Sequence, residues 1–173
     1  AGKSDDPIAE VWALHEDNLV NKGIFAGRTL GELSAEYPAE ILRTHAAGPE
    51  NKRFPLLINL LDCERWLSLQ VHPNDEQARQ LEGPEFIGKT EAWYILNAQT
   101  DAQLIAGIKP NSSVEALHAA IGNEAILDLV EYHSVQTSDT VFMPAGTIHA
   151  LGPGLLVYEV QQTSDLTYRV FDW

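Results

Sequence analysis

Short strand patterns follow one another from Phe54 to the C-terminus, separated by Gly, Pro and polar turn residues. Seven or eight such strands are typical of an all-β sandwich or barrel. The continuous apolar run at 54–61 favours a strand buried on both faces. Asp75 is positioned to cap a short helix, and Ser112 with Glu115 has capping-box spacing. We therefore predict a mainly β fold, a β-barrel with a helical insertion near 112–130.

The N-terminal third has helical and loop patterns in place of strand patterns. Thr29 and Glu32 have capping-box spacing and open a short helical pattern, whereas 45–52 has the composition of a loop. A chain of 173 residues suits one domain with a real core. We predict a single catalytic domain, with an N-terminal extension of short helices at 1–50 and a metal-binding barrel at 51–173.

Charge and cysteine content narrow the function classes. The formal net charge is -14, which disfavours binding to nucleic acid or to an anionic membrane. Cys63 is the single cysteine and lies in an apolar run, so we expect a buried, reduced thiol. No secretory leader pattern or membrane-spanning stretch is evident, which predicts a cytoplasmic protein. An anionic substrate would require local positive charge at its site.

Four residues form a candidate metal site. Gln70 and His72 are two apart on a predicted strand and therefore project from the same face. Two polar side chains facing a barrel interior need partners, and a metal would satisfy both. A Pro-x-Gly-x-x-His motif at 144–149 presents His149, and Glu91 opens another predicted strand. This motif is typical of the cupin superfamily, whose small jelly-roll barrels hold a metal-binding His.

The ligand types favour one metal. Two imidazoles, one carboxylate and one amide oxygen suit catalytic zinc, which keeps a position open for water or substrate. A ligand charge of only -1 leaves such an ion a good Lewis acid. An iron-dependent cupin dioxygenase is the competing reading of the barrel, but oxygenases prefer histidine-rich ligand sets.

Four motifs resemble those of the type I phosphomannose isomerases. They are Leu-Ser-Leu-Gln-Val-His-Pro-Asn-Asp at 67–75, Gly-Lys-Thr-Glu-Ala-Trp-Tyr at 88–94, Met-Pro-Ala-Gly-Thr-Ile-His-Ala-Leu-Gly at 143–152, and Gln-Thr-Ser-Asp-Leu-Thr-Tyr-Arg-Val-Phe-Asp-Trp at 162–173. The resemblance covers nearly the whole chain. It implies a cupin fold, a zinc site of Gln, His, Glu and His, and interconversion of mannose 6-phosphate and fructose 6-phosphate through a cis-enediol.

The resemblance also implies roles for residues around the metal. In the family's pattern, Gln70, His72, Glu91 and His149 hold the zinc ion. Arg169, Lys89 and Glu159 are the implied catalytic residues, with Arg169 as a permanent cation and the other two as acid–base candidates. Ser68 matches a serine that contacts the substrate.

Two departures from the family's pattern have consequences for function. The family usually carries Lys eleven residues before the metal Gln, near the substrate phosphate, where this chain has Asn59, and an amide supplies no full charge. Family members also usually start earlier and continue into a further β domain beyond the segment that ends here at Trp173. A sugar-phosphate-binding cupin without catalysis and an incomplete isomerase therefore stay open as alternatives. We further hypothesise a homodimer that covers an exposed barrel edge.

Overall fold

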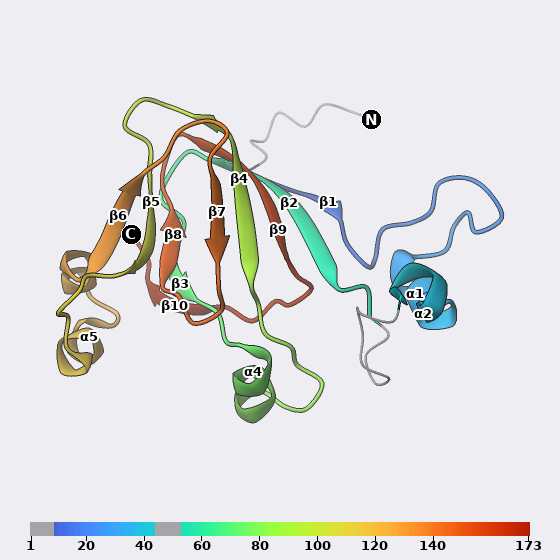
Figure 1. Cartoon of the computed structure of the whole chain (residues 1–173), viewed down its shortest axis with the longest axis horizontal. Helices are drawn as coiled ribbons and strands as arrows, with labels where there is room; N and C mark the ends of the chain where they lie inside the picture. The colour runs from blue at the N-terminus through green and yellow to red at the C-terminus, as the bar shows by residue number, and fades with distance from the viewer. Residues whose placement is uncertain (1–8, 44–52) are drawn as a thin grey trace.

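A computed structural model describes residues 9–43 and 53–173 of the chain. Two antiparallel five-stranded sheets form the body of the molecule (Figure 1). The first sheet has the order β1 (Glu10–Leu14), β2 (Leu56–Cys63), β9 (Leu155–Gln162), β4 (Glu91–Ala98), β7 (Thr140–Met143). The second has the order β10 (Tyr168–Phe171), β3 (Leu69–Val71), β8 (His149–Leu151), β5 (Gln103–Ile108), β6 (Val130–Ser134). The predicted mainly β fold is confirmed.

Strand β1 lies in the segment where the sequence predicts only short helices. It pairs with β2 and so belongs to the first sheet, with Val11 opposite Leu60. Strand β8 was also missed, because its three residues directly follow the turn that presents His149. The loop predicted at 45–52 lies outside the described residues.

The short helices begin close to where the sequence predicts them. Helix α1 (Leu30–Glu36) has the predicted capping box of Thr29 and Glu32, and α2 (Pro38–Ile41) follows it directly. Two N-caps differ from prediction by one residue. Asn74, not Asp75, caps α4 (Asp75–Leu81), and Ser113, not Ser112, caps α5 (Val114–Ala120). In both cases the preceding extended residue accepts the bond from the N3 amide.

The predicted insertion near 112–130 consists of α5 and the 3₁₀ helix η1 (Glu124–Asp128), and it covers the outer face of the second sheet. Ala120 and Ile126 pack there against Ile105 and Ala150, all of them buried. Between the sheets, a separate cluster includes Ile95, Leu104, Leu151 and Val157. Among the described residues, no helix is both long and apolar enough to cross a membrane.

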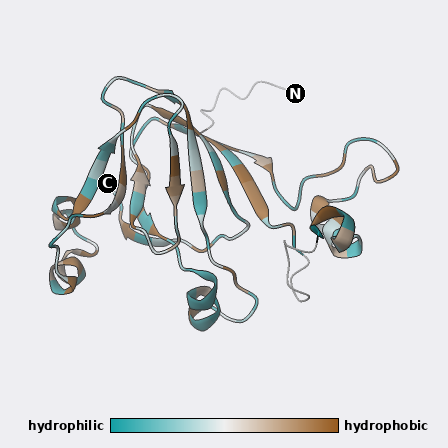
Figure 2. Ribbon diagram, viewed as in Figure 1, coloured by the Kyte–Doolittle hydropathy of each residue, from teal (hydrophilic) through white to brown (hydrophobic). Residues whose placement is uncertain are grey.

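The outer face of the first sheet is apolar and exposed. Strand β2 alternates between buried positions and positions that are exposed or half-buried, so the prediction that 54–61 is buried on both faces is wrong. Leu56, Tyr94 and Phe142 project from the outer face with exposed fractions of 38%, 41% and 67%. Figure 2 shows much of β2 and β7 in brown, the colour of hydrophobic residues. No described helix packs on this face as α5 and η1 pack on the other sheet.

Candidate metal centre and the cavity around it

Strand register brings the predicted site residues together between the sheets. In the second sheet, Gln70 on β3 lies opposite His149 on β8 and opposite Arg169 on β10. In the first sheet, Glu91 on β4 lies opposite Gln161 on β9. Directly paired residues share a face of a sheet, so each of these rows directs its polar side chains to one side.

Two glycines in the site motifs occupy backbone positions that other residues would not fit. A Cβ on Gly88 would lie 2.5 Å from the carbonyl carbon of Asn74, so only glycine allows this loop to pack against the end of β3. Gly146 has a φ of 86° and its N–H donates to the carbonyl of His72 at 2.8 Å. These contacts hold the loop that carries Lys89 and the turn after Pro144 against residues 72–75, which connect β3 to α4.

Three buried side chains converge on one point. The Nε2 atom of His72 lies 3.3 Å from Oε1 of Glu91, and Nε2 of His149 lies 3.5 Å from Oε2 of the same carboxylate. Each of the three is at most 2% exposed, and their candidate ligand atoms all lie within 4.8 Å of one another. His72 and His149 come from the second sheet and Glu91 from the first. The centre therefore links the two sheets.

The hydrogen bonds of the two imidazoles indicate which ring nitrogen of each carries the proton. His72 Nδ1 is 2.8 Å from the carbonyl oxygen of Leu166, and His149 Nδ1 is 2.9 Å from that of Thr147. A carbonyl can only accept, so Nδ1 carries the proton and Nε2 presents a lone pair to the centre. Both Nε2 atoms and Oε2 of Glu91 are buried without a hydrogen-bond partner. A divalent cation would satisfy all three, so these residues fit a metal ion.

Burial and charge at the centre favour an ionised Glu91 carboxylate and a neutral His149 imidazole. Burial raises the pKa of Glu91, but His72, the Lys89 ammonium and His149 together lower it to about 2. The Lys89 Nζ lies 3.1 Å from Oε1 of Glu91. Burial lowers the pKa of His149 to about 4, against the opposing attraction of Glu91. Metal binding requires these protonation states.

Glu159 lies beside this centre in a network that spans three strands. Its register partners are Asn59 on β2 and Trp93 on β4, both directly opposite it. Asn59 Nδ2 donates to Oε1 at 3.0 Å, and Trp93 Nε1 donates to Oε2 at 2.7 Å. Burial, followed by repulsion from Glu91, raises the pKa of Glu159 to about 7 despite these bonds. Asn59, predicted to lie near a phosphate, thus has a carboxylate as its neighbour.

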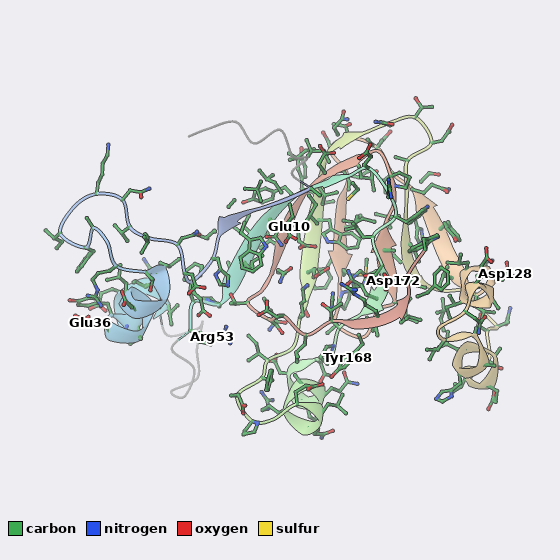
Figure 3. The ribbon with its side chains drawn as sticks, turned by 180° about the vertical axis from the view of Figure 1, so that it is seen from behind. Glu10, Glu36, Arg53, Asp128, Tyr168 and Asp172 are labelled. Carbon is green, nitrogen blue, oxygen red and sulfur yellow. The ribbon has the colours of Figure 1, made fainter. Side chains whose placement is uncertain are left out.

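A cavity of about 410 Å³ joins the remaining predicted residues to the centre. Its lining includes all of the predicted site residues except the two histidines: Ser68, Gln70, Lys89, Glu91, Asn59, Glu159 and Arg169. Glu10 and Asp172, which Figure 3 labels, line it as well and are exposed. The Arg169 side chain is 68% exposed and pairs with Asp172 at 3.8 Å, so it lies at the mouth rather than inside. A larger cavity of about 550 Å³, lined by Cys63 and Arg65 among others, contains none of the predicted residues.

Two buried lining residues with polar side-chain groups were not predicted from the sequence. Trp93 and Gln161 both line the cavity and are at most 4% exposed. Each stands two positions after a predicted site residue on a strand, Glu91 and Glu159 respectively, and so shares its face. This two-residue spacing is the sequence signal from which both residues could have been predicted to line the site. Cys63 is 2% exposed and free, as predicted, and burial raises its pKa to about 12.

Fold and site together define a two-sheet, cupin-like barrel with a candidate metal centre of two histidines and a glutamate inside it. Residues 2–86 match the sequence model of the family described as phosphomannose isomerase type I, catalytic domain. The chain belongs to this type I phosphomannose isomerase family, as its four motifs predict.

Individual relatives agree with this assignment. The chain is 40% identical over 169 residues to mannose-6-phosphate isomerase ManA of Bacillus subtilis, covering 95% of this chain and 51% of that protein. It is 38% identical over 172 residues to mannose-6-phosphate isomerase of Streptococcus mutans, covering 97% and 52%. The crystal structure of mannose 6-phosphate isomerase from Bacillus subtilis superposes with a TM-score of 0.83 at 38% identity, covering 95% and 52%. The chain thus spans about half the length of these relatives.

Proposed function

We propose that this chain carries the catalytic site of a zinc-dependent aldose–ketose isomerase that interconverts mannose 6-phosphate and fructose 6-phosphate through a cis-enediol. One observation carries the proposal: three buried, unpartnered ligand atoms converge beside a lysine and a second, separately held carboxyl group. Family membership and relatives named mannose-6-phosphate isomerases support the substrate.

Zinc would be held by Gln70, His72, Glu91 and His149. The bound ion would act as a Lewis acid that polarises a substrate oxygen and stabilises negative charge at the reacting carbons. The preset Nε2 lone pairs favour this assignment, because they need no proton loss before binding. Gln70 is included because it lines the cavity and lies in register with His149.

Glu159 is the better of the two acid–base candidates. A group whose pKa is about 7 can both accept and release a proton near neutral pH, which proton transfer between adjacent carbons requires. Lys89 instead has its ammonium beside the Glu91 carboxylate. We assign to Lys89 the stabilisation of negative charge on the substrate rather than proton transfer.

Arg169 and Ser68, which both line the cavity, are proposed to bind substrate. The exposed guanidinium can exchange its ion pair with Asp172 for a phosphate or an enediolate at little cost, since surface pairs contribute little. The Asn59 side chain carries no charge, and its amide nitrogen already donates to Glu159. Asn59 would therefore contact substrate only as a polar group.

The test is turnover of mannose 6-phosphate to fructose 6-phosphate by the zinc-loaded chain, beside a chelated sample. We expect metal-dependent turnover that is lost in Glu159→Gln and strongly reduced in Lys89→Met. Near-normal turnover in Glu159→Gln would refute the acid–base assignment, and near-normal turnover in Lys89→Met would refute the role given to Lys89. Anaerobic purification with metal analysis separates zinc from iron, and an iron-loaded, oxygen-consuming protein would favour the dioxygenase alternative.

One structural observation keeps a second candidate function in view. Asn59 stands where the family usually has a lysine, and its amide nitrogen donates to Glu159. The cavity therefore has one cation fewer for binding a phosphate than the family's pattern provides. A sugar-phosphate-binding protein without turnover, or an isomerase site incomplete in this chain alone, would bind mannose 6-phosphate and leave it unchanged. Asn59→Lys that restores turnover would identify the missing charge as the cause.

The wider biological context also remains our proposal. We propose a cytoplasmic enzyme with a single catalytic domain, in which 51–173 form the metal-binding barrel and the N-terminal extension at 1–50 contributes β1 to its first sheet. For the proposed homodimer, the exposed apolar face that carries Leu56, Tyr94 and Phe142 is a better contact surface than a strand edge. A monomer by light scattering at working concentration would remove the homodimer.

A further inference from the structure

Gln161 is a buried glutamine to which the mechanism above gives no role. It is 4% exposed and lines the same cavity as Glu91 and Glu159. It lies directly opposite Glu91 across the β4–β9 pair and two residues beyond Glu159 on β9. A paired residue and an i+2 residue share one face, so its side chain neighbours both Glu91 of the metal centre and the candidate acid–base group Glu159.

Two backbone carbonyls determine which way its amide points. The Nε2 atom donates to the carbonyl of Gln162 at 3.2 Å and to that of Ser164 at 3.3 Å. Carbonyl oxygens only accept, so a flipped amide would place oxygen against oxygen. The orientation of this side chain is therefore fixed by its surroundings.

The opposite end of the amide is an available acceptor. Across residues 9–43 and 53–173, no donor bonds to Oε1 of Gln161, and this atom is not among the buried, unpartnered oxygens. Because the residue lines the cavity while its nitrogen is held by the backbone, the oxygen is the end that a bound molecule meets. An oriented amide oxygen accepts a hydrogen bond and gives no charge.

We propose that Gln161 is a substrate-binding residue whose Oε1 accepts a hydrogen bond from one hydroxyl group of a sugar bound at the metal centre, and that this bond sets specificity for that hydroxyl. The inference rests on the proposed isomerase function and names the part of the substrate that Gln161 reads. A carboxyl group at this place would be the third beside Glu91 and Glu159, whereas an amide accepts a hydrogen bond without repelling a phosphorylated sugar. A site built to bond a hydroxyl discriminates against an analogue that lacks it.

The experiment compares Gln161→Met with wild type against mannose 6-phosphate and its monodeoxy analogues, each modified at one ring position. Met keeps the volume of Gln but has no strong acceptor. We expect wild type to bind one deoxy analogue about tenfold more weakly than the parent sugar phosphate. Gln161→Met should bind the parent about tenfold more weakly as well, and should no longer distinguish it from that analogue.

Controls separate this role from a structural one. Gln103→Met changes a half-buried glutamine on β5 outside the cavity and should leave every affinity unchanged. Equal weakening of parent and all analogues in Gln161→Met, or no weakening, would overturn the proposal. Loss of zinc from Gln161→Met would also overturn it, since Gln161 would then act on the metal. If wild type isomerises mannose 6-phosphate in any of these cases, the proposed function stands and only the Gln161 assignment fails. A wild-type chain that binds no sugar phosphate would refute both.

Discussion

Replacing Glu159 by Gln is expected to change how the stability of the chain depends on pH. Burial raises the pKa of the Glu159 carboxyl from 4.5 to about 7, which corresponds to about 3 kcal/mol for ionising it in the folded state. Below pH 4.5 the group is protonated in both folded and unfolded chains and contributes nothing to the pH dependence. Between these pKa values the unfolded chain loses the proton while the folded chain keeps it, so stability falls as pH rises.

The Gln variant lacks this titration. Its free energy of unfolding, relative to wild type, should therefore increase by roughly 2–3 kcal/mol between about pH 5 and pH 8. Asn59 can present its buried, unpartnered Oδ1 to the new amide, which limits the cost of the substitution. Urea unfolding followed by tryptophan fluorescence, with chelator present, measures both proteins, because a bound cation would favour the ionised carboxylate.

Glu64→Gln is the matched control. Glu64 is exposed in the loop after β2, so this variant removes the same charge without burial. We expect its difference from wild type to be the same at both pH values. If Glu159→Gln also shows a constant difference, burial does not hold the proton on Glu159, and our reason for choosing it as the acid–base group is refuted.

Four further perturbations have defined outcomes. Zinc at about 1,000 times its dissociation constant should add about 4 kcal/mol and raise the melting temperature by roughly 8–16 °C, as thermal unfolding with and without chelator would measure. Glu91→Ala should abolish this shift, and a retained shift would place zinc elsewhere. Gly88→Ala should cost about 1–3 kcal/mol in urea unfolding, because its Cβ would clash with the Asn74 backbone, and an unchanged midpoint would show that the loop can move away. Phe142→Asp should convert any dimer to a monomer in light scattering without loss of stability, since this side chain is 67% exposed, and a persistent dimer would exclude the apolar face as its interface.

Much of the site could be predicted because its signals are local. Alternation along β3 places Gln70 and His72 on one face, and the Pro-x-Gly-x-x-His turn presents His149; both patterns depend on a few neighbouring residues. The capping box at Thr29 is local in the same sense. The N-caps at 74 and 113 were predicted one residue late or early because adjacent residues there offer equivalent acceptors, and backbone conformation chooses between them.

The sequence by itself determined the strand-rich class, the family and the set of polar residues worth following. Only the tertiary structure decided that Asn59, Trp93 and Glu159 form one network, because strand register joins residues far apart in the chain. It also decided that β2 has an exposed face, which an apolar run alone cannot indicate. Burial and neighbouring charge, and hence the pKa values of Glu91 and Glu159, arise only once the two sheets face each other.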